Sequence, residues 1–321
     1  MSARYVLRRL FEALLAVVGI LLLTFVLVQA APGDPVHALG ADGSDPEYLE
    51  YLRSLLHLDR PLADQITTYS GNVLRGRLGN SFIQGRPVTE VIGERLWPTL
   101  LLMGTTLVLS SLIGTALGVL ASRRPYGRFD LAVNSAALVC YAVPAFWLGQ
   151  IAILTVALRT GWFPLQGLTD PRAQYTGWAH VADVAHHLIL PALVLAASEI
   201  ALITRVTRTG LIQELGKDYV RAARARGAHE RSVVFGQALP NALLPLVTII
   251  GARLGALFSG AVVIETVFSW PGLGSLIVSS SQTRDRPVLL GLVLMVGFTV
   301  VVANLLTDLV YGWIDPRIRY E

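Results

Sequence analysis

The chain has 321 residues, of which 53% are apolar and only 15% are charged. A charged share so far below the ~25% of an ordinary soluble domain excludes a typical soluble protein and indicates that a lipid bilayer is the solvent. The net charge of +4 comes from arginines that punctuate apolar segments, since Lys217 is the only lysine, and this distribution argues against a nucleic-acid-binding protein.

Six apolar stretches are long enough to cross the hydrocarbon core of a bilayer, which takes ~20 helical residues. They lack the alternation of polar and apolar residues that a membrane β-barrel strand requires. We therefore predict an all-α integral membrane protein with six transmembrane helices. In chain order, the predicted helices cover residues 10–29, 97–121, 131–158, 188–204, 241–263 and 289–313.

The first predicted helix lies in an N-terminal segment, residues 1–30, and has an alternative interpretation. Val28, Gln29 and Ala30 follow an apolar run that is preceded by arginines, as at a signal-peptide cleavage site. The apolar run is longer than the ~7 to 15 residues of a signal core. We expect a retained transmembrane helix, with cleavage as the alternative.

An extracytoplasmic segment is predicted at residues 31–96, between the first two helices. Pro32 and Pro35 with the glycine between them end the preceding helix in a turn. Apolar residues recur at helical spacing after Pro46, and residues 61–75 offer a second short helix. The segment is either a lid on the helix bundle or a docking surface for an external partner, and the sequence favours neither role.

The distribution of basic residues sets the predicted orientation. With the N-terminus inside, the inner loops and tails carry 15 basic residues, whereas the three outer loops, which are longer in total, carry ten. Basic residues are enriched in cytoplasmic loops. Both termini, including a short tail at residues 315–321, are therefore expected on the cytoplasmic side.

Charged residues within the predicted spans include Glu199, Arg253 and Asp308. Charges inside a membrane are costly, so each is expected to pair across helices or to line a watery pathway, and pairing is favoured. A proton relay would instead indicate a secondary transporter. These charges are sparse, however, and no inverted repeat of broken helices is evident.

Small residues and prolines mark where helices are expected to approach closely or to bend. The small residues recur at four-residue spacing, which predicts close packing within the chain before packing against a partner. They are Ser110, Gly114, Gly118 and Ser122. The prolines that can kink the predicted spans are Pro144, Pro191 and Pro245.

The long inner loop at residues 205–240 is the most informative segment, because a simple connection between neighbouring helices needs only ~2 to 8 residues. Its centre begins at Asp218, continues with alanines and arginines, and reaches Gly227, where a helix would end. We predict a short, basic, cytoplasmic helix there. Alternatively, its arginines only set the topology or contact anionic lipid.

This loop resembles the EAA loop of ABC-importer permeases. The resemblance rests on Ala222 and Ala223, on Gly227 and on the later Leu239-Pro240. The family has glutamate and isoleucine where Arg221 and Gln237 stand in this chain. The resemblance implies that separate ATPase subunits dock on the predicted helix. The coupling residues that it implies are Tyr219, Arg221, Ala222, Ala223, Gly227, Leu239 and Pro240.

Other segments resemble, more narrowly, the dipeptide/oligopeptide permease family. They are Pro32-Gly33-Asp34-Pro35, Arg77-Leu78-Gly79-Asn80-Ser81, residues 265–274 and residues 315–319. Where relatives often have an aromatic residue after Arg284-Asp285, this chain has Arg286. The resemblance implies the type I ABC-importer permease fold, with its core at residues 97–314, and import of di- or oligopeptides across the cytoplasmic (inner) membrane. Nickel or glutathione is the alternative cargo.

The resemblance also implies the partners of the chain. They are a second homologous permease, two cytoplasmic ATPase subunits, an extracytoplasmic substrate-binding protein and membrane lipid. ATP and Mg²⁺ would be bound by the ATPase subunits, and no cofactor by this chain. In agreement, a phosphate-binding P-loop needs Gly-Lys-Ser/Thr, whereas Lys217 is followed by Asp218. We expect that the chain is not an enzyme.

A metal site and a membrane-bound hydrolase are two less favoured alternatives. His180, His186 and His187, with Asp183, could ligate a divalent metal, but surface histidines are commoner than metal sites, and no cysteine or fixed ligand spacing supports one. We predict no metal site. A membrane-bound hydrolase is less favoured, because the sequence contains no recognisable catalytic arrangement.

Overall fold

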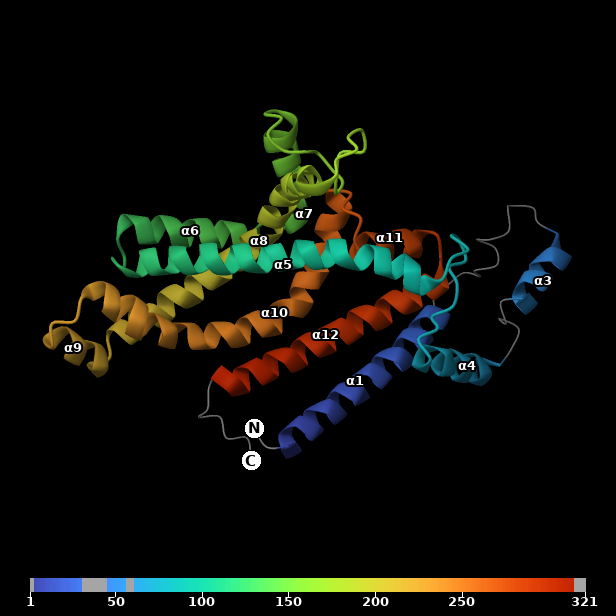
Figure 1. Ribbon diagram of the computed structural model, residues 1–321, viewed down its shortest axis with the longest axis horizontal. Coiled ribbons are helices and arrows are strands. Elements are labelled where there is room, and N and C mark those ends of the chain that lie inside the picture. Colours follow the sequence, from blue (N-terminus) through green and yellow to red (C-terminus); the bar gives the residue numbers. More distant parts are fainter. Residues whose placement is uncertain (1–2, 31–44, 56–60, 315–321) are drawn as a thin grey trace. The chain divides into compact units, whose positions relative to one another are not determined.

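The computed structural model describes residues 3–30, 45–55 and 61–314. This part of the chain consists of helices joined by turns and irregular loops, with an isolated bridge between Asn80 and Pro87 and no strand (Figure 1). The all-α prediction is therefore confirmed. The helices belong to two compact units, one formed by Met1–Trp97 with Gly272–Glu321 and the other by Pro98–Pro271.

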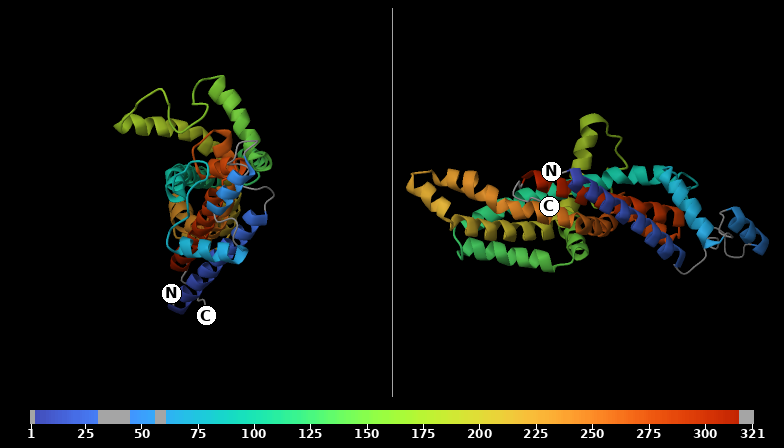
Figure 2. Two further views of the ribbon diagram at one scale, coloured as in Figure 1. Left: turned by 90° about the vertical axis from the view of Figure 1, so that its right-hand side faces the viewer. Right: turned by 90° about the horizontal axis from the view of Figure 1, so that it is seen from below.

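The first unit is organised around a pair of long helices. Its elements are α1 (Ala3–Ala30), α3 (Pro46–Leu55), α4 (Leu62–Leu74), the start of α5 (Val88–Ser122), α11 (Leu273–Gln282) and α12 (Arg286–Ile314). Helices α1 and α12 run side by side (Figures 1 and 2). They approach closely at Gly297, where a Cβ atom would lie 2.8 Å from the side chain of Ile20. The two short helices predicted before the second span are confirmed as α3 and α4.

A buried carboxylate in the first unit holds the turn that precedes α5. Asp285 accepts hydrogen bonds from the hydroxyl of Ser81 (2.5 Å) and from the backbone N–H of Phe82 (3.1 Å). The turn is closed by Val88, whose N–H donates to the carbonyl of Gly79 (2.9 Å). Gly79 has a φ of +82°, a conformation that favours glycine. The segments around residues 77–81 and 284–286, which the sequence marked only by resemblance, therefore form one contact.

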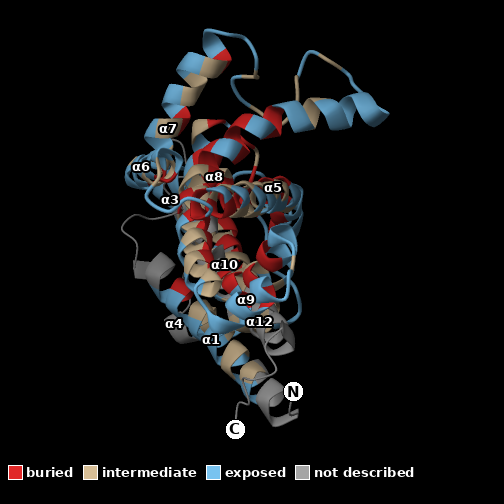
Figure 3. Ribbon diagram, turned by 90° about the vertical axis from the view of Figure 1, so that its left-hand side faces the viewer, coloured by how far each residue is buried: buried red, intermediate tan, exposed pale blue. Residues whose placement is uncertain are grey.

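The second unit is organised around α8. Its elements are the rest of α5, α6 (Arg128–Ala142), α7 (Ala145–Ala152), the π-helical η1 (Ile153–Leu158), α8 (Gly177–Leu215), α9 (Asp218–Ala225), the π-helical η2 (Ser232–Ala238) and α10 (Leu239–Val267). Helix α8 packs against α6 and α10, and buried residues line both α8 and α10 (Figure 3). The most deeply buried apolar residues of the main core are Leu102, Ala192, Ala261, Ile264, Phe268 and Trp270.

The segment after α10 folds back onto α5 within this unit. The hydroxyl of Thr99 donates to the buried carboxylate of Glu265 (2.6 Å), and the indole N–H of Trp270 donates to the carbonyl of Pro98 (2.9 Å). The backbone N–H of Trp270 donates to the carbonyl of Glu265 (2.7 Å), which closes the C-terminal end of α10. These bonds give a structural reason for the acid and the tryptophan in the motif at residues 265–274.

The helix predicted at residues 131–158 is broken, which corrects the prediction. Helix α6 ends at Ala142, α7 begins at Ala145, and the two parts are bent by 104°. Pro144 has no N–H to donate to the preceding turn, and a residue before proline avoids the helical region, as Val143 does with a ψ of 128°. Pro191 and Pro245 lie inside continuous helices instead.

The other five predicted spans fall inside α1, α5, α8, α10 and α12. Helices α5 and α8, with 35 and 39 residues, are each long and apolar enough to cross a membrane. The bent pair, α6 followed by α7 with η1, is also long and apolar enough when its two parts are counted as one span. The described residues of the other three contain shorter apolar stretches. The count of six spans and the side on which the termini lie therefore stay predictions. Because α8 continues to Leu215, the inner connection begins later than residue 205.

Helices α5 and α8 cross at the predicted small residues. A Cβ atom on Gly114 would lie 2.7 Å from the side chain of Ile203. One on Gly118 would lie 2.7 Å from the side chain of Thr207 and 2.9 Å from the carbonyl oxygen of Thr204. Only glycine permits such an approach of two backbones. Close packing of these residues within the chain is confirmed.

Gly118→Ala should destabilise the protein, because the added methyl group meets the backbone of α8. We expect a loss of about 1–3 kcal/mol, the usual cost of overpacking, seen as a lower midpoint of thermal unfolding in detergent. Gly104 on the same helix is the matched control, since a Cβ atom there meets nothing within 4 Å. Gly104→Ala should keep or raise the midpoint. Equal midpoints for the two variants would contradict the packing at the crossing.

Asp285→Ala should loosen the turn before α5, because the Ser81 hydroxyl and the Phe82 N–H lose their acceptor. The expected cost is about 1–3 kcal/mol, measured by thermal unfolding, with faster proteolysis between residues 77 and 88. Glu90→Gln is the control, because Glu90 is exposed in the same unit, and it should change stability by less than about 0.5 kcal/mol. Unchanged melting and cleavage in Asp285→Ala would refute this role.

Candidate functional site

Helix α9 occupies the position predicted for the short basic helix. It begins at Asp218, whose acidic side chain suits the first turn, and ends at Ala225. Gly227 follows with a φ of +80°, its N–H donates to the carbonyl of Arg224 (2.9 Å), and the N–H of Ala228 donates to that of Ala223 (3.1 Å). A glycine in this conformation is a common helix terminator. The predicted helix and its glycine stop are confirmed.

One face of α9 is buried and the other is open. Val220 and Ala223 pack with Val233 of η2, and Leu215 at the end of α8 covers them. Arg221 and Ala222 are exposed. Ala223 is 1% exposed and supports the helix from below, and its part in coupling stays a prediction.

Tyr219 connects α9 to both neighbouring long helices. Its hydroxyl donates to the carboxylate of Glu214 (2.8 Å) and accepts from the side-chain amide of Asn241 (3.3 Å). Lys217 donates to the other oxygen of Glu214 (2.6 Å). Burial raises the pKa of the Tyr219 hydroxyl, and Glu214 raises it further, so the hydroxyl stays protonated and can donate at neutral pH. The sequence did not mark Glu214 and Asn241 as residues of this site, because neither belongs to a recognisable motif.

The arginines of α9 make ion pairs only at the surface. Nη2 of Arg221 lies 2.7 Å from Oδ1 of Asp218, and both side chains are mostly exposed. Arg224 donates to Glu230 (2.7 Å) and lowers the pKa of that carboxyl group, so the pair persists at neutral pH. Exposed pairs contribute little to stability. These side chains remain accessible to a partner.

Leu239 and Pro240 begin α10, as the sequence pattern requires. Leu239 is half-buried against a small apolar cluster, and Pro240 is exposed in the first turn, where a proline removes no helical hydrogen bond. The cluster joins α5, α8, η2 and α10 through Val119, Leu211, Val234, Ala238 and Ala242. The cluster thus fastens η2, against which α9 packs, to the long helices.

The described residues do not test the pairing of the predicted intramembrane charges. Glu199 is half-buried on α8. The side chains of Arg253 on α10 and Asp308 on α12 lie outside the described residues. Their pairing stays a prediction. A different buried ion pair, between Asp130 and Arg208, is present, and the sequence did not indicate it because the two residues are 78 positions apart.

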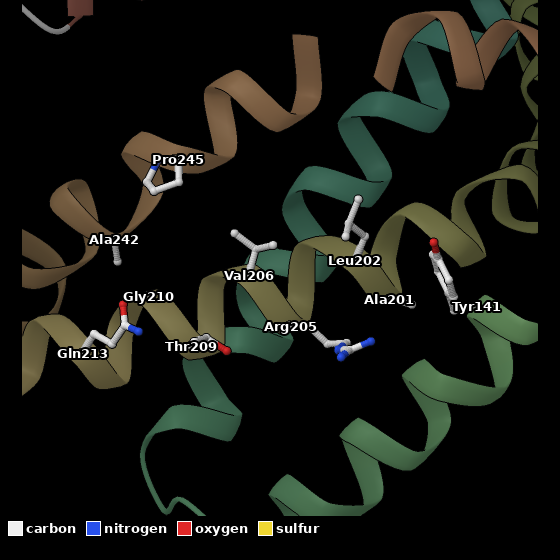
Figure 4. A pocket seen from close by; sticks show the side chains of 10 residues that line it. All are labelled: Tyr141, Ala201, Leu202, Arg205, Val206, Thr209, Gly210, Gln213, Ala242 and Pro245. Carbon is white, nitrogen blue, oxygen red and sulfur yellow. The ribbon is translucent and has the colours of Figure 1, made fainter. Parts of the chain in front are cut away.

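A pocket of about 520 Å³ opens between α6, α8 and α10 (Figure 4). Arg205, Thr209 and Gln213 recur at four-residue spacing and give the α8 wall of the pocket its polar character. Tyr141 contributes from α6. The remaining lining residues, mostly apolar, are Ala201, Leu202, Val206, Gly210, Ala242 and Pro245.

Two of the three outer histidines, His186 and His187, make hydrogen bonds within the chain. Nε2 of His186 lies 2.7 Å from the carbonyl oxygen of Trp162, and Nδ1 of His187 lies 2.9 Å from that of Asp183. No group of three or more His, Cys, Asp or Glu residues within the described ranges is arranged to hold a metal ion.

Comparison with known proteins assigns the chain to a family. The family model described as "Binding-protein-dependent transport system inner membrane component" matches residues 114–320, and the model for the N-terminal part of such components matches residues 2–103. The oligopeptide transport system permease protein AppB of Bacillus subtilis is 38% identical over 99% of this chain and 100% of its own length. The dipeptide transport system permease protein DppB of Escherichia coli is 38% identical over 99% of each chain.

Solved structures support the same fold. A chain of the MetNI methionine ABC transporter in an inward-facing conformation has a TM-score of 0.56 and 18% identity, covering 71% of this chain and 97% of that one. A chain of an amino acid ABC transporter crystallised with histidines has a TM-score of 0.50 and 16% identity over 72% and 95%. The fold is therefore that of type I ABC-importer permeases, and the chain belongs to the dipeptide/oligopeptide branch of the binding-protein-dependent transport system inner membrane components.

Proposed function

We propose that this chain forms part of a peptide pathway through the cytoplasmic membrane and that separate ATPase subunits drive transport by acting on α9. The arrangement of α9 carries this proposal. The helix presents an exposed face with Arg221 and Ala222, while its buried face and Tyr219 fasten it to α8 and α10. Because α9 is anchored in this way, a force on its exposed face would displace the attached helices and would not detach α9 from them.

The motion would reach the long helices through the contacts of α9. Displacement of α9 acts on α8 through Leu215 and Glu214, and on α10 through Asn241. Packed helices shift as rigid elements because their cores resist continuous deformation. One side of the pathway would thus open as the other closes, with ATP and Mg²⁺ bound by the partner subunits and no hydrolysis by this chain.

The cargo and the remaining partners follow from the relatives. AppB and DppB are named as permeases for oligopeptides and dipeptides, and peptides are the cargo that we propose here. The assembly would contain a second homologous permease, two ATPase subunits, an extracytoplasmic substrate-binding protein and surrounding lipid. Nickel and glutathione are the alternative cargoes, and an uptake assay with each separates them.

Gly227→Val should impair docking of the ATPase subunits, because a β-branched residue is strained at a φ of +80° and shifts the end of α9. The tagged chain is purified from its native membranes, and bound subunits are identified by mass spectrometry. Wild type should bring down a second permease and ATPases, and Gly227→Val should retain the permease but recover about tenfold less ATPase, which corresponds to ~1.4 kcal/mol.

The matched control is Gly216→Ala, since Gly216 has a φ of −82° and an added Cβ atom would make only ordinary contacts there. It should recover wild-type amounts of both partners. A wild-type chain that purifies alone and still transports substrate would show that the proposed function is wrong.

Thr209→Trp tests whether the pocket belongs to the peptide pathway. The larger side chain would fill the space beside Arg205, so ATP-driven peptide uptake in proteoliposomes should fall severalfold while the ATPase subunits remain bound. Leu193→Trp is the control, because Leu193 is exposed on the same helix and does not line the pocket. Equal uptake by the two variants would place the pathway elsewhere.

A further inference from the structure

A buried ion pair joins α6 to α8 near the C-terminal end of α8. Asp130, in the first turn of α6, is 1% exposed. Arg208 donates from Nε to one carboxylate oxygen and from Nη2 to the other, the second bond measuring 2.6 Å. A bidentate pair of this kind fixes the relative orientation of both side chains.

The turn before α6 is built around the same carboxylate. The N–H of Tyr126 and the side-chain amide of Asn134 each donate to it at 2.7 Å. Tyr126 has a φ of +63°, which is costly for a bulky residue, and the guanidinium of Arg208 lies 5.9 Å from the centre of its ring. We call Tyr126, Asp130, Asn134 and Arg208 together the Asp130 joint.

The Asp130 joint lies where α8 is also held by α5. Thr207, the neighbour of Arg208, meets Gly118 at the crossing of the two helices. From this level α8 continues without a break to Leu215, which packs against the buried face of α9. Seven helical residues cover only about 10 Å, so a displacement of α9 reaches the joint through one short, rigid segment.

A contribution to the stability of the fold does not by itself explain why an ion pair is buried at this place. The cost of removing two charges from water offsets much of their attraction, and an apolar pair of similar size is often as stable. Two oppositely charged groups with four converging donors do, however, define one geometry. The Asp130 joint is therefore suited to positioning.

We propose that Asp130 and Arg208 are positioning residues that make α6 move together with α8 when α9 is displaced. This inference rests on the proposed function, in which ATPase subunits displace α9. Without the bidentate contact, α8 would shift while α6 lags behind. ATP would then be hydrolysed with little peptide moved.

The test measures peptide uptake and ATP hydrolysis in the same proteoliposomes that contain the complete complex. Asp130→Asn and Arg208→Lys each remove the bidentate contact while nearly preserving side-chain size. Both should hydrolyse ATP at a rate close to wild type and import about fivefold less peptide per ATP, the lower range of typical coupling effects. Arg123→Gln is the control, because Arg123 is exposed in the same turn and its guanidinium makes no hydrogen bond or ion pair within the described residues. It should keep the wild-type ratio.

Arg208→Lys decides the matter if Asp130→Asn does not assemble, because lysine keeps the charge and one donor. A wild-type ratio of peptide to ATP in Arg208→Lys overturns the inference. So does an equal loss of uptake and hydrolysis, which would reveal a purely structural role.

A second readout separates this inference from the proposed function. Spin labels at Ser135 on α6 and Gln213 on α8, in a Cys140→Ser background, report the distance between the helices with and without ATP. The distance should stay constant in wild type and change in Arg208→Lys. A wild-type complex that imports no peptide refutes the proposed function alone, and the label distances then still decide whether α6 follows α8.

Discussion

The continuous packing of α8 is the constraint on which the second unit depends. The helix has 39 residues and packs against α5, α6 and α10. Its N-terminal half contributes Leu190, Ala192 and Leu195 to the main apolar core, and its C-terminal half ends against α9. Because the helix is not interrupted, it carries a change at α9 to the core as a rigid rod of about 58 Å.

Charged residues have two distinct roles according to their burial. The ion pairs on α9, such as that of Arg221 with Asp218, are exposed, stabilise the chain little and leave a basic surface open. The buried carboxylates of Asp130, Glu265 and Asp285 each tie together segments that are far apart in sequence. A carboxylate is economical for this purpose because its two oxygens accept several hydrogen bonds at once.

The sequence predicted most of the helices and the central helix of the site, because these depend on local pattern. Apolar length located five long helices, and the alanines before Gly227 located α9. Local pattern also indicated that Gly118 lies at a close helix contact. It could not show that Pro144 would bend the chain by 104°, since prolines at 191 and 245 are accommodated inside helices.

Contacts between distant segments were beyond the reach of the sequence. Ser81 and Asp285 are 204 positions apart, and Asp130 and Arg208 are 78 positions apart. The burial of Ala223 has the same origin, because its neighbour Val233 comes from η2 and cannot be placed without the fold. Motif resemblance marked Ala223 as a coupling residue, but it could not show that the side chain is buried.

The most direct test of the central claim is the energy source of transport. The complete complex is reconstituted in proteoliposomes with its binding protein, and import of a labelled peptide is measured with ATP or with a proton gradient alone. We predict that import requires ATP and the ATPase subunits and does not depend on the proton gradient. Import driven by the gradient through this chain without ATPase subunits would contradict it and would return attention to Glu199, Arg253 and Asp308.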